Sequence, residues 1–150
     1  MKVNFPLLVS PEDVESLNFD WGTVRFTLSP KVNGAARFSA GVVFVHPHAG
    51  HARHNHPGAE EIIHIISGAG EQMIEDEDGA PIVRPVRAGT TVFIPESRYH
   101  STMNTSDEPM LVFVVYSPAG PEKVVRETPG CRIEPPKGER SDCEMADMAD

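Results

Sequence analysis

Three features are scarce in this sequence, and each scarcity argues against a class of protein. Only two cysteines occur among 150 residues, Cys131 and Cys143, and their spacing suits neither a disulfide framework nor a cysteine zinc site. The 13 lysines and arginines form no basic cluster, and 22 aspartates and glutamates give a net charge of -9. This balance argues against nucleic acid and anionic membranes as partners. No apolar run approaches the roughly 20 residues of a membrane helix.

The N-terminus also lacks the cationic start and the cleavage site of a signal peptide. Together with the low cysteine count, this pattern predicts a cytoplasmic protein. The length is typical of one domain that is large enough to bury a core.

The hydrophobic pattern predicts strands and almost no helix. Short apolar or alternating runs recur between turns that are rich in glycine, proline, asparagine and aspartate; they cover residues 23–29, 37–45, 61–67, 71–75, 82–86, 91–94, 101–103 and 110–116. One short helix is predicted to begin at Pro11, with Ser10 as its cap. The run 110–116 is apolar throughout, which is typical of a strand that is buried on both faces. Pattern alone leaves a β-sandwich and a β-barrel open.

Histidine and glutamate residues in the middle of the chain suggest a metal site. His54 and His56 are two residues apart, so on a strand their side chains would share one face. Glu61 heads an apolar run whose alternation points the carboxylate inward, where it needs a positive charge nearby. A metal ion held by imidazoles supplies that charge. His100, which follows a separate predicted strand, can add a third imidazole from the far side.

These residues resemble the two sequence motifs of the cupin superfamily. The first motif is matched by His54, His56, Glu61 and Gly68, and the second by Gly89, Pro95, His100 and Asn104. Ser97 replaces the glycine that the second motif has between its proline and its histidine. That turn therefore needs a conformation that a residue other than glycine can adopt. This departure does not touch a position that would hold the metal.

The resemblance covers about residues 38–118 and identifies the chain as a small, single-domain cupin of the cupin 2 type. It implies an all-β fold with a single jelly-roll β-barrel (a double-stranded β-helix), an architecture that leaves few exposed edges. We assign residues 1–118 to this barrel and an apolar N-terminal lead-in. Residues 119–150 form a tail that is first proline-rich and then acidic. Val124, Val125 and Ile133 are expected to dock the tail on the barrel, and the last ten residues to stay in solvent.

The resemblance also implies one divalent transition metal held by His54, His56, Glu61 and His100. Three imidazoles and one carboxylate suit iron, manganese, nickel or zinc, and they leave two positions for water, substrate or dioxygen. His64 lies on the opposite phase from Glu61 and is expected to point away from the ion.

The remaining candidates are less sharply defined. Four residues are predicted to line the cavity and contact a substrate, namely Gln72, Tyr99, Met103 and Tyr116. The histidines of the loop before the ligand strand, His46, His48 and His51, either bind substrate and move protons or are exposed polar residues. The sequence leaves both interpretations open, and it identifies no catalytic base.

Two functions follow from such a site. The favoured one is a small metal-dependent enzyme of dioxygenase, isomerase, cyclase or decarboxylase type, which acts on an oxygen-rich small molecule inside the barrel. The alternative is a non-catalytic module that binds a metabolite or sugar and uses the metal as a structural anchor. Because cupins are commonly dimers, and because residues 5–9 form an apolar lead-in that one small barrel leaves uncovered, a homodimer is also expected.

Overall fold

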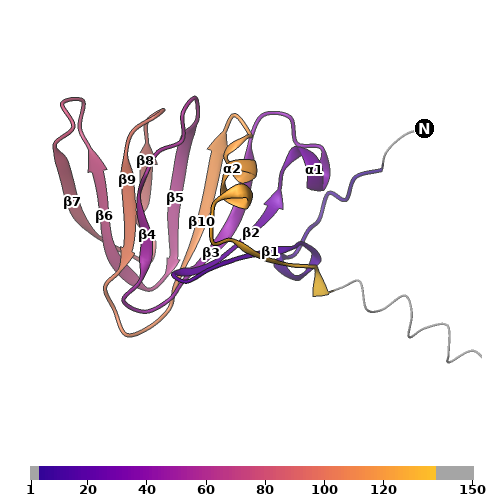
Figure 1. The fold of residues 1–150 in the computed structure, drawn as a ribbon, viewed down its shortest axis with the longest axis horizontal. Helices are drawn as coiled ribbons and strands as arrows, with labels where there is room; N and C mark the ends of the chain where they lie inside the picture. The colour runs from indigo at the N-terminus through magenta and orange to yellow at the C-terminus, as the bar shows by residue number, and fades with distance from the viewer. Residues whose placement is uncertain (1–3, 138–150) are drawn as a thin grey trace, which may run out of the picture.

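The computed structural model describes residues 4–137, which form two antiparallel β-sheets and three short helical segments (Figure 1). The larger sheet has the strand order β11-β1-β2-β3-β10-β5-β8. Its strands are β1 (Ser16–Phe19), β2 (Gly22–Leu28), β3 (Ser39–Val45), β5 (Glu60–Ser67), β8 (Thr91–Ile94), β10 (Met110–Ser117) and β11 (Arg132–Glu134). The smaller sheet has the order β4-β9-β6-β7, with β4 (Gly50–His54), β6 (Ala69–Glu75), β7 (Pro81–Arg87) and β9 (His100–Asn104).

The chain passes repeatedly from one sheet to the other. β4, β6 and β9 lie in the smaller sheet, whereas β5, β8 and β10, which alternate with them along the sequence, lie in the larger one. This alternation is the topology of a jelly roll, so the predicted all-β jelly-roll class is confirmed. It has a consequence for function, because it brings β4, β5 and β9 together across the interior although His54 and His100 are 46 positions apart in the sequence.

Alternation within the strands builds the core between the sheets. On β10 the inward residues are Met110, Val112, Val114 and Tyr116, all of which are buried. The outward residue Phe113 is 37% exposed, so the prediction that this strand is buried on both faces is wrong. β10 is central in the sheet, between β3 and β5, and its outward residues range from half-buried Leu111 and Val115 to exposed Phe113. Its outward apolar residues instead pair with residues of the two neighbouring strands, as Val115 does with Ile62.

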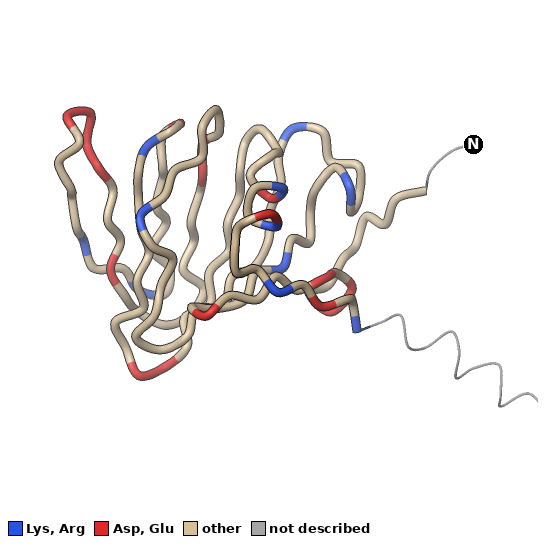
Figure 2. Tube along the Cα trace, viewed as in Figure 1, with Lys and Arg blue, Asp and Glu red and all other residues tan. Residues whose placement is uncertain are grey.

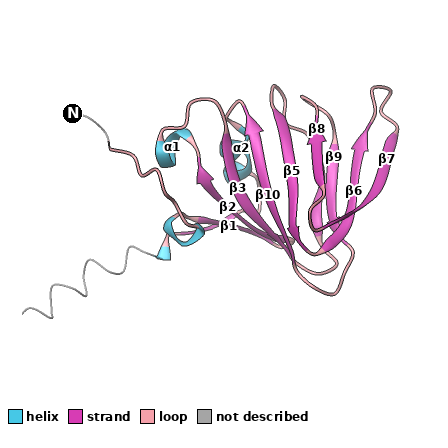
Figure 3. Ribbon diagram, turned by 180° about the vertical axis from the view of Figure 1, so that it is seen from behind, coloured by secondary structure: helices cyan, strands magenta, loops and turns pink. Residues whose placement is uncertain are grey.

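The helical segments are η1 (Pro11–Asp13), α1 (Pro30–Asn33) and α2 (Pro121–Glu127). The predicted helix start at Pro11 is the single 3-10 turn η1, where the Ser10 backbone N–H donates to the Asp13 carboxylate at 2.7 Å. Seen from behind, α2 lies beside β3 and β10, and α1 lies near the end of β2 (Figure 3). None of the described helices is long and apolar enough to cross a membrane.

Residues beyond 118 pack against the barrel more extensively than the sequence predicted. The helix α2 was not expected, because seven residues are too few to show a helical period. Its Val125 is buried in the main core, as predicted, whereas Val124 is 66% exposed and does not dock. Ile133 is partly exposed, and its strand β11 pairs with β1 at the edge of the larger sheet. The domain boundary at residue 118 stays a prediction, and the last ten residues lie outside the described part of the chain.

Charged residues are spread over the whole fold. Figure 2 shows lysines and arginines at separate places, interspersed with acidic residues. This distribution agrees with the absence of a basic cluster from the sequence.

Candidate metal centre

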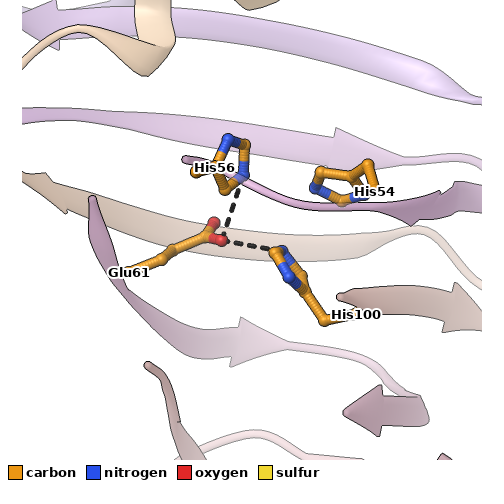
Figure 4. A group of neighbouring side chains, drawn as sticks. All are labelled: His54, His56, Glu61 and His100. Atoms are coloured by element: carbon orange, nitrogen blue, oxygen red, sulfur yellow. Dashed lines mark ion pairs between the residues drawn. The ribbon is translucent and has the colours of Figure 1, made fainter. Parts of the chain in front are cut away.

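The structure brings together the four residues that the sequence predicted as ligands. His54 is the last residue of β4, His56 lies in the loop that follows, Glu61 is on β5, and His100 is the first residue of β9. One nitrogen or oxygen atom from each residue lies within 4.8 Å of the corresponding atoms of the others. Figure 4 shows the four side chains converging on one point between the strands.

Local strand irregularities aim these side chains inward. His54 pairs with His100 across β4 and β9, and the register of this pair of strands shifts between His51 and His54. An extra residue in a strand reverses the alternation, so residues three apart come to share a face. His56 does not lie on the strand, contrary to the prediction, because β4 ends at His54.

The loop that carries His56 is held by the turn around Ser97. The Ser97 backbone N–H donates to the His56 carbonyl at 3.3 Å, and the Ser97 hydroxyl accepts from the Gly58 N–H at 3.3 Å. The Asn55 side-chain amide donates to the Ser97 carbonyl at 3.1 Å. Ser97 has φ 60, the left-handed conformation that glycine normally adopts. The serine at this position thus adds a hydrogen bond that glycine could not make.

Three of the four ligand atoms are buried and have no hydrogen-bond partner. One carboxylate oxygen of Glu61, Oε2, lies 2.9 Å from His100 Nε2 and 3.3 Å from His56 Nε2. None of these three atoms makes a hydrogen bond. Burial raises the pKa of the Glu61 carboxyl, whereas hydrogen bonds and positive charge from protonated His100 and His56 would lower it to about 2. With both imidazoles neutral, a cation bound between these atoms would supply that charge, and without one the unpaired buried atoms are costly.

The outer nitrogens of two imidazoles fix which nitrogen faces the site. His54 Nδ1 lies 2.7 Å from the Ala52 carbonyl oxygen, and His100 Nδ1 lies 2.9 Å from the Arg98 carbonyl oxygen. A carbonyl oxygen can only accept, so each Nδ1 carries the proton and donates it. Nε2 of each neutral ring then has a lone pair for a metal. The donor set, its burial and its unpaired atoms all fit one divalent transition ion.

The sequence leaves the role of one histidine at the site, His51, open. His51 stacks on His54 with ring centroids 3.7 Å apart and on Trp21 at 4.7 Å. Burial, and then the nearby His56, lower the pKa of His51 to about 4. The register shift in β4 explains why His51 joins the site, since three-residue spacing does not reveal a shared face in a regular strand. His46 is exposed. His48 is exposed as well, and its Nε2 lies 2.6 Å from Oδ1 of Asp107.

The four predicted substrate contacts divide between the interior and the surface. Tyr116 lines a small cavity beside the candidate ligands. Gln72 is buried but does not line this cavity; its Oε1 accepts from the hydroxyl of Thr102, a lining residue, at 2.7 Å. Tyr99 is 38% exposed, with the Arg53 guanidinium 3.7 Å above its ring, and Met103 is 38% exposed. The structure does not bring these last two to the cavity.

His64 points away from the site, as predicted, and its Nδ1 lies 2.9 Å from the Thr91 hydroxyl.

A small cavity adjoins the candidate ligands. Its volume is about 40 Å³, and valines from β2, β3 and β10 are the most frequent lining residues, with Trp21, Thr102 and Tyr116 among the others. Burial, and then the charge of Glu61, raise the pKa of Tyr116 well above its usual 10, so its phenol stays protonated. The cavity therefore offers metal ligands and a neutral O–H donor within apolar walls.

The fold is an antiparallel jelly roll, and four side chains in its interior could together hold one metal ion. These features define a barrel protein with a candidate mononuclear metal centre. The chain belongs to the cupin domain family, whose model matches residues 41–116.

Similar proteins include Protein SchB of Streptomyces halstedii, 34% identical over 107 residues, which cover 71% of this chain and 74% of that protein. Polyketide synthase CurC of Streptomyces cyaneus is 28% identical over 117 residues, 78% of this chain and 73% of that protein. A glucose-6-phosphate isomerase of Thermococcus onnurineus is 34% identical over 65 residues, which cover 42% of this chain and 34% of the isomerase.

Among solved structures, the oxalate decarboxylase of Lactobacillus farciminis in complex with formate has the same fold, with a TM-score of 0.71 and 25% identity. The match covers 77% of this chain and 34% of the decarboxylase chain, so this chain corresponds to about a third of that protein.

Removal of one imidazole tests the ligand set. His56→Ala and His100→Ala should each lower the affinity for the transition ion by at least about tenfold, because each removes a ligand atom. His64→Ala is the matched control, since this side chain lies on the same strand as Glu61 but points outward. Elemental analysis of protein purified without a histidine tag measures the bound metal. A His56→Ala protein that is still fully loaded would contradict the assignment.

The buried histidines predict how stability depends on pH. Burial first, and neighbouring imidazoles next, lower the pKa of His54 to about 3 and that of His51 to about 4, from 6.5. Because these pKa values are lower in the folded state, the unfolded state binds more protons below pH 6.5. Stability of the metal-free protein should thus be full above pH 6.5 and fall as the pH decreases toward 3.

In the metal-loaded protein, acid also competes with the ion for the imidazoles, so the loss should be steeper and should begin below about pH 5 to 6. Thermal unfolding across this range, with and without a chelator, measures both effects. An identical pH response in the two conditions would show that no ion is bound through these histidines.

Proposed function

We propose that this protein is a metal-dependent enzyme that acts on an oxygen-rich small molecule inside the barrel. The observation that carries the proposal is the cluster of three buried ligand atoms, on His56, Glu61 and His100, that face one another without hydrogen bonds. A bound divalent ion would polarise a carbonyl oxygen or a water molecule there. His54, His56, Glu61 and His100 would hold it, and iron, manganese, nickel and zinc all suit this donor set.

Residues of the protein itself would exclude water and donate a hydrogen bond to the substrate. The valine walls exclude water, which strengthens every electrostatic interaction in the cavity. Tyr116 pairs with Glu61 across β10 and β5, so its phenol lies beside the ligand cluster. As a group that stays protonated, Tyr116 can donate a hydrogen bond to a substrate oxygen on which negative charge develops.

The lining of the cavity favours a substrate without a phosphate or a second carboxylate. Among the described residues, no lysine or arginine lines it, and the only acidic side chain is the ligand Glu61. Anions such as oxalate and glucose 6-phosphate, which occur in the names of two similar enzymes, would find no cation there other than the ion.

A mostly apolar carbon skeleton with several carbonyl or hydroxyl groups fits these walls better. SchB and CurC match most of this chain and most of their own length, and CurC is named a polyketide synthase. We infer a polyketide-like substrate, and among the reaction classes a cyclase or dioxygenase acting on such a skeleton.

One observation favours a second candidate function. The cavity volume of about 40 Å³ leaves no space for a whole substrate in this conformation. This supports a non-catalytic module in which the metal is a structural anchor and a metabolite or sugar binds at the barrel mouth. A cytoplasmic location stays a prediction in either case.

Glu61→Gln separates the two functions. The substitution keeps the size and an oxygen ligand but removes the negative charge. In an enzyme it should lower turnover of a pool of polyketides by about 10–100-fold while the metal-loaded protein stays folded. Glu60→Gln, an exposed neighbour on the same strand, is the control. Product analysis with and without oxygen distinguishes a dioxygenase from a cyclase. The binding-module function would be favoured if wild-type protein converts nothing and Glu61→Gln mainly loses metal and stability.

We also propose a homodimer. Leu7 and Leu8 of the lead-in are 89% and 93% exposed, and on the outer face of the larger sheet Ile62 and Phe93 pair with each other and are also exposed. Both surfaces are apolar enough to attract a second copy. Light scattering at tens of micromolar should therefore give the mass of a dimer. Leu8→Asp and Phe93→Asp should show which surface is used, because only a charge inside the interface would produce monomers. A monomeric wild type would remove the proposal.

A further inference from the structure

The cavity beside the candidate metal ligands and a second cavity differ greatly in size. Pockets that bind small molecules usually measure roughly 300–1,000 Å³. The metal cavity, at about 40 Å³, falls far below this range, whereas a second cavity of about 520 Å³ lies well within it. The second cavity, called the outer cavity below, has apolar side chains as the larger part of its lining, among them Leu17, Phe26 and Val32. Six charged residues of η1, the loop that follows it, α1 and α2 also line it, including Lys31 and Arg126.

Only a thin layer of side chains separates the two cavities. Leu17 lines the outer cavity and pairs across β1 and β2 with Val24, which lines the metal cavity. Phe26 of the outer cavity lies 6.2 Å, between ring centroids, from Tyr116 of the metal cavity.

Helix α2 contributes to both walls, since Val125 lines the metal cavity and Glu122 the outer one. α2 is therefore part of the partition.

The attachment of α2 to the barrel includes an incompletely satisfied carboxylate. Glu122 Oε2 accepts from the Ser39 hydroxyl at 2.7 Å and from the Gly120 N–H at 2.7 Å. The other oxygen, Oε1, is buried without a hydrogen-bond partner. A buried unpaired acceptor costs free energy that is recovered when the group meets water or a donor, so the closed position of α2 is less favourable than its packing suggests. The helix follows Gly120 at φ 148, a conformation that only glycine adopts readily.

We propose that α2 is a movable partition and that its displacement joins the two cavities into one substrate site. The oxygens of the substrate bind at the ion, and its apolar body lies in the outer cavity against Phe26 and Val32. This inference rests on the proposed function and specifies it further. The substrate is an elongated, mostly apolar or aromatic molecule that carries its chelating oxygens at one end.

Two diketones with the same chelating head test where the body lies. Acetylacetone has the head alone, and benzoylacetone adds a phenyl ring. Binding to the metal-loaded protein is measured by calorimetry, at concentrations that leave the metal content unchanged. Benzoylacetone should bind about tenfold more tightly or better, because its ring is buried in an apolar space.

Val32→Phe, which fills the outer cavity without touching the ligands, should abolish this advantage and leave acetylacetone binding unchanged. The control is Val124→Phe, the same substitution on the exposed side of α2. If Val32→Phe does not fold, Val32→Leu is used instead. Its smaller side chain occupies less of the outer cavity, so benzoylacetone should lose a smaller part of its affinity advantage. Equal affinities of the two diketones, or an advantage that survives in the folded Val32 variant, would overturn the inference while the proposed function stands. Binding of neither diketone would overturn both.

The movement of α2 has a separate readout. Ser39→Ala removes the hydroxyl that donates to Glu122 and should let dipicolinate extract the ion severalfold faster, at a temperature well below the unfolding transition. Glu127→Gln, a neutralising change on the exposed side of the same helix, should leave the extraction rate unchanged. An unchanged rate in Ser39→Ala would show that α2 does not gate the metal cavity.

Discussion

The interior of this protein depends on how one buried charge is balanced. Glu61 extends from β5 into a core of valine and isoleucine, where an ionised carboxylate is strongly unfavourable alone. Two imidazole nitrogens lie within 3.3 Å of its oxygen, yet none of the three atoms is hydrogen-bonded. A divalent cation satisfies all three at once. Because that cation would be bound by β4, β5 and β9 or their adjoining loops, it would also tie the two sheets of the barrel together.

The surroundings of the ligands hold them in place before any ion binds. Backbone carbonyls of Ala52 and Arg98 orient two of the imidazoles, and the Ser97 turn holds the loop of the third. The stack of Trp21 and His51 supports His54 from the other side. Such preorganisation would lower the free-energy cost of binding an ion.

The chemistry of the site and the shape of the interior favour the same substrate class. The ion would be the only cationic group in the metal cavity, so it would favour a substrate with oxygen donors. The apolar lining residues favour a substrate whose remaining part is hydrocarbon. A sugar phosphate would lose its hydration without gaining partners. The proposed polyketide-like substrate draws on the name of one relative, the polyketide synthase CurC, and the outer cavity has a volume that such a skeleton would require.

The sequence by itself determined the class of fold, the family and the four candidate ligands, because each depends on short-range spacing. Alternation defines inward faces, turn residues end strands, and the motif around Glu61 and that around His100 have fixed internal distances. Tertiary structure alone decided the rest. The register shift in β4 placed His51 in the site. The outer face of β10 is apolar because this strand is central in its sheet, not because both of its faces are buried. The packing of α2 created the partition, which no local pattern could reveal, since a seven-residue helix is stabilised by contacts distant in sequence.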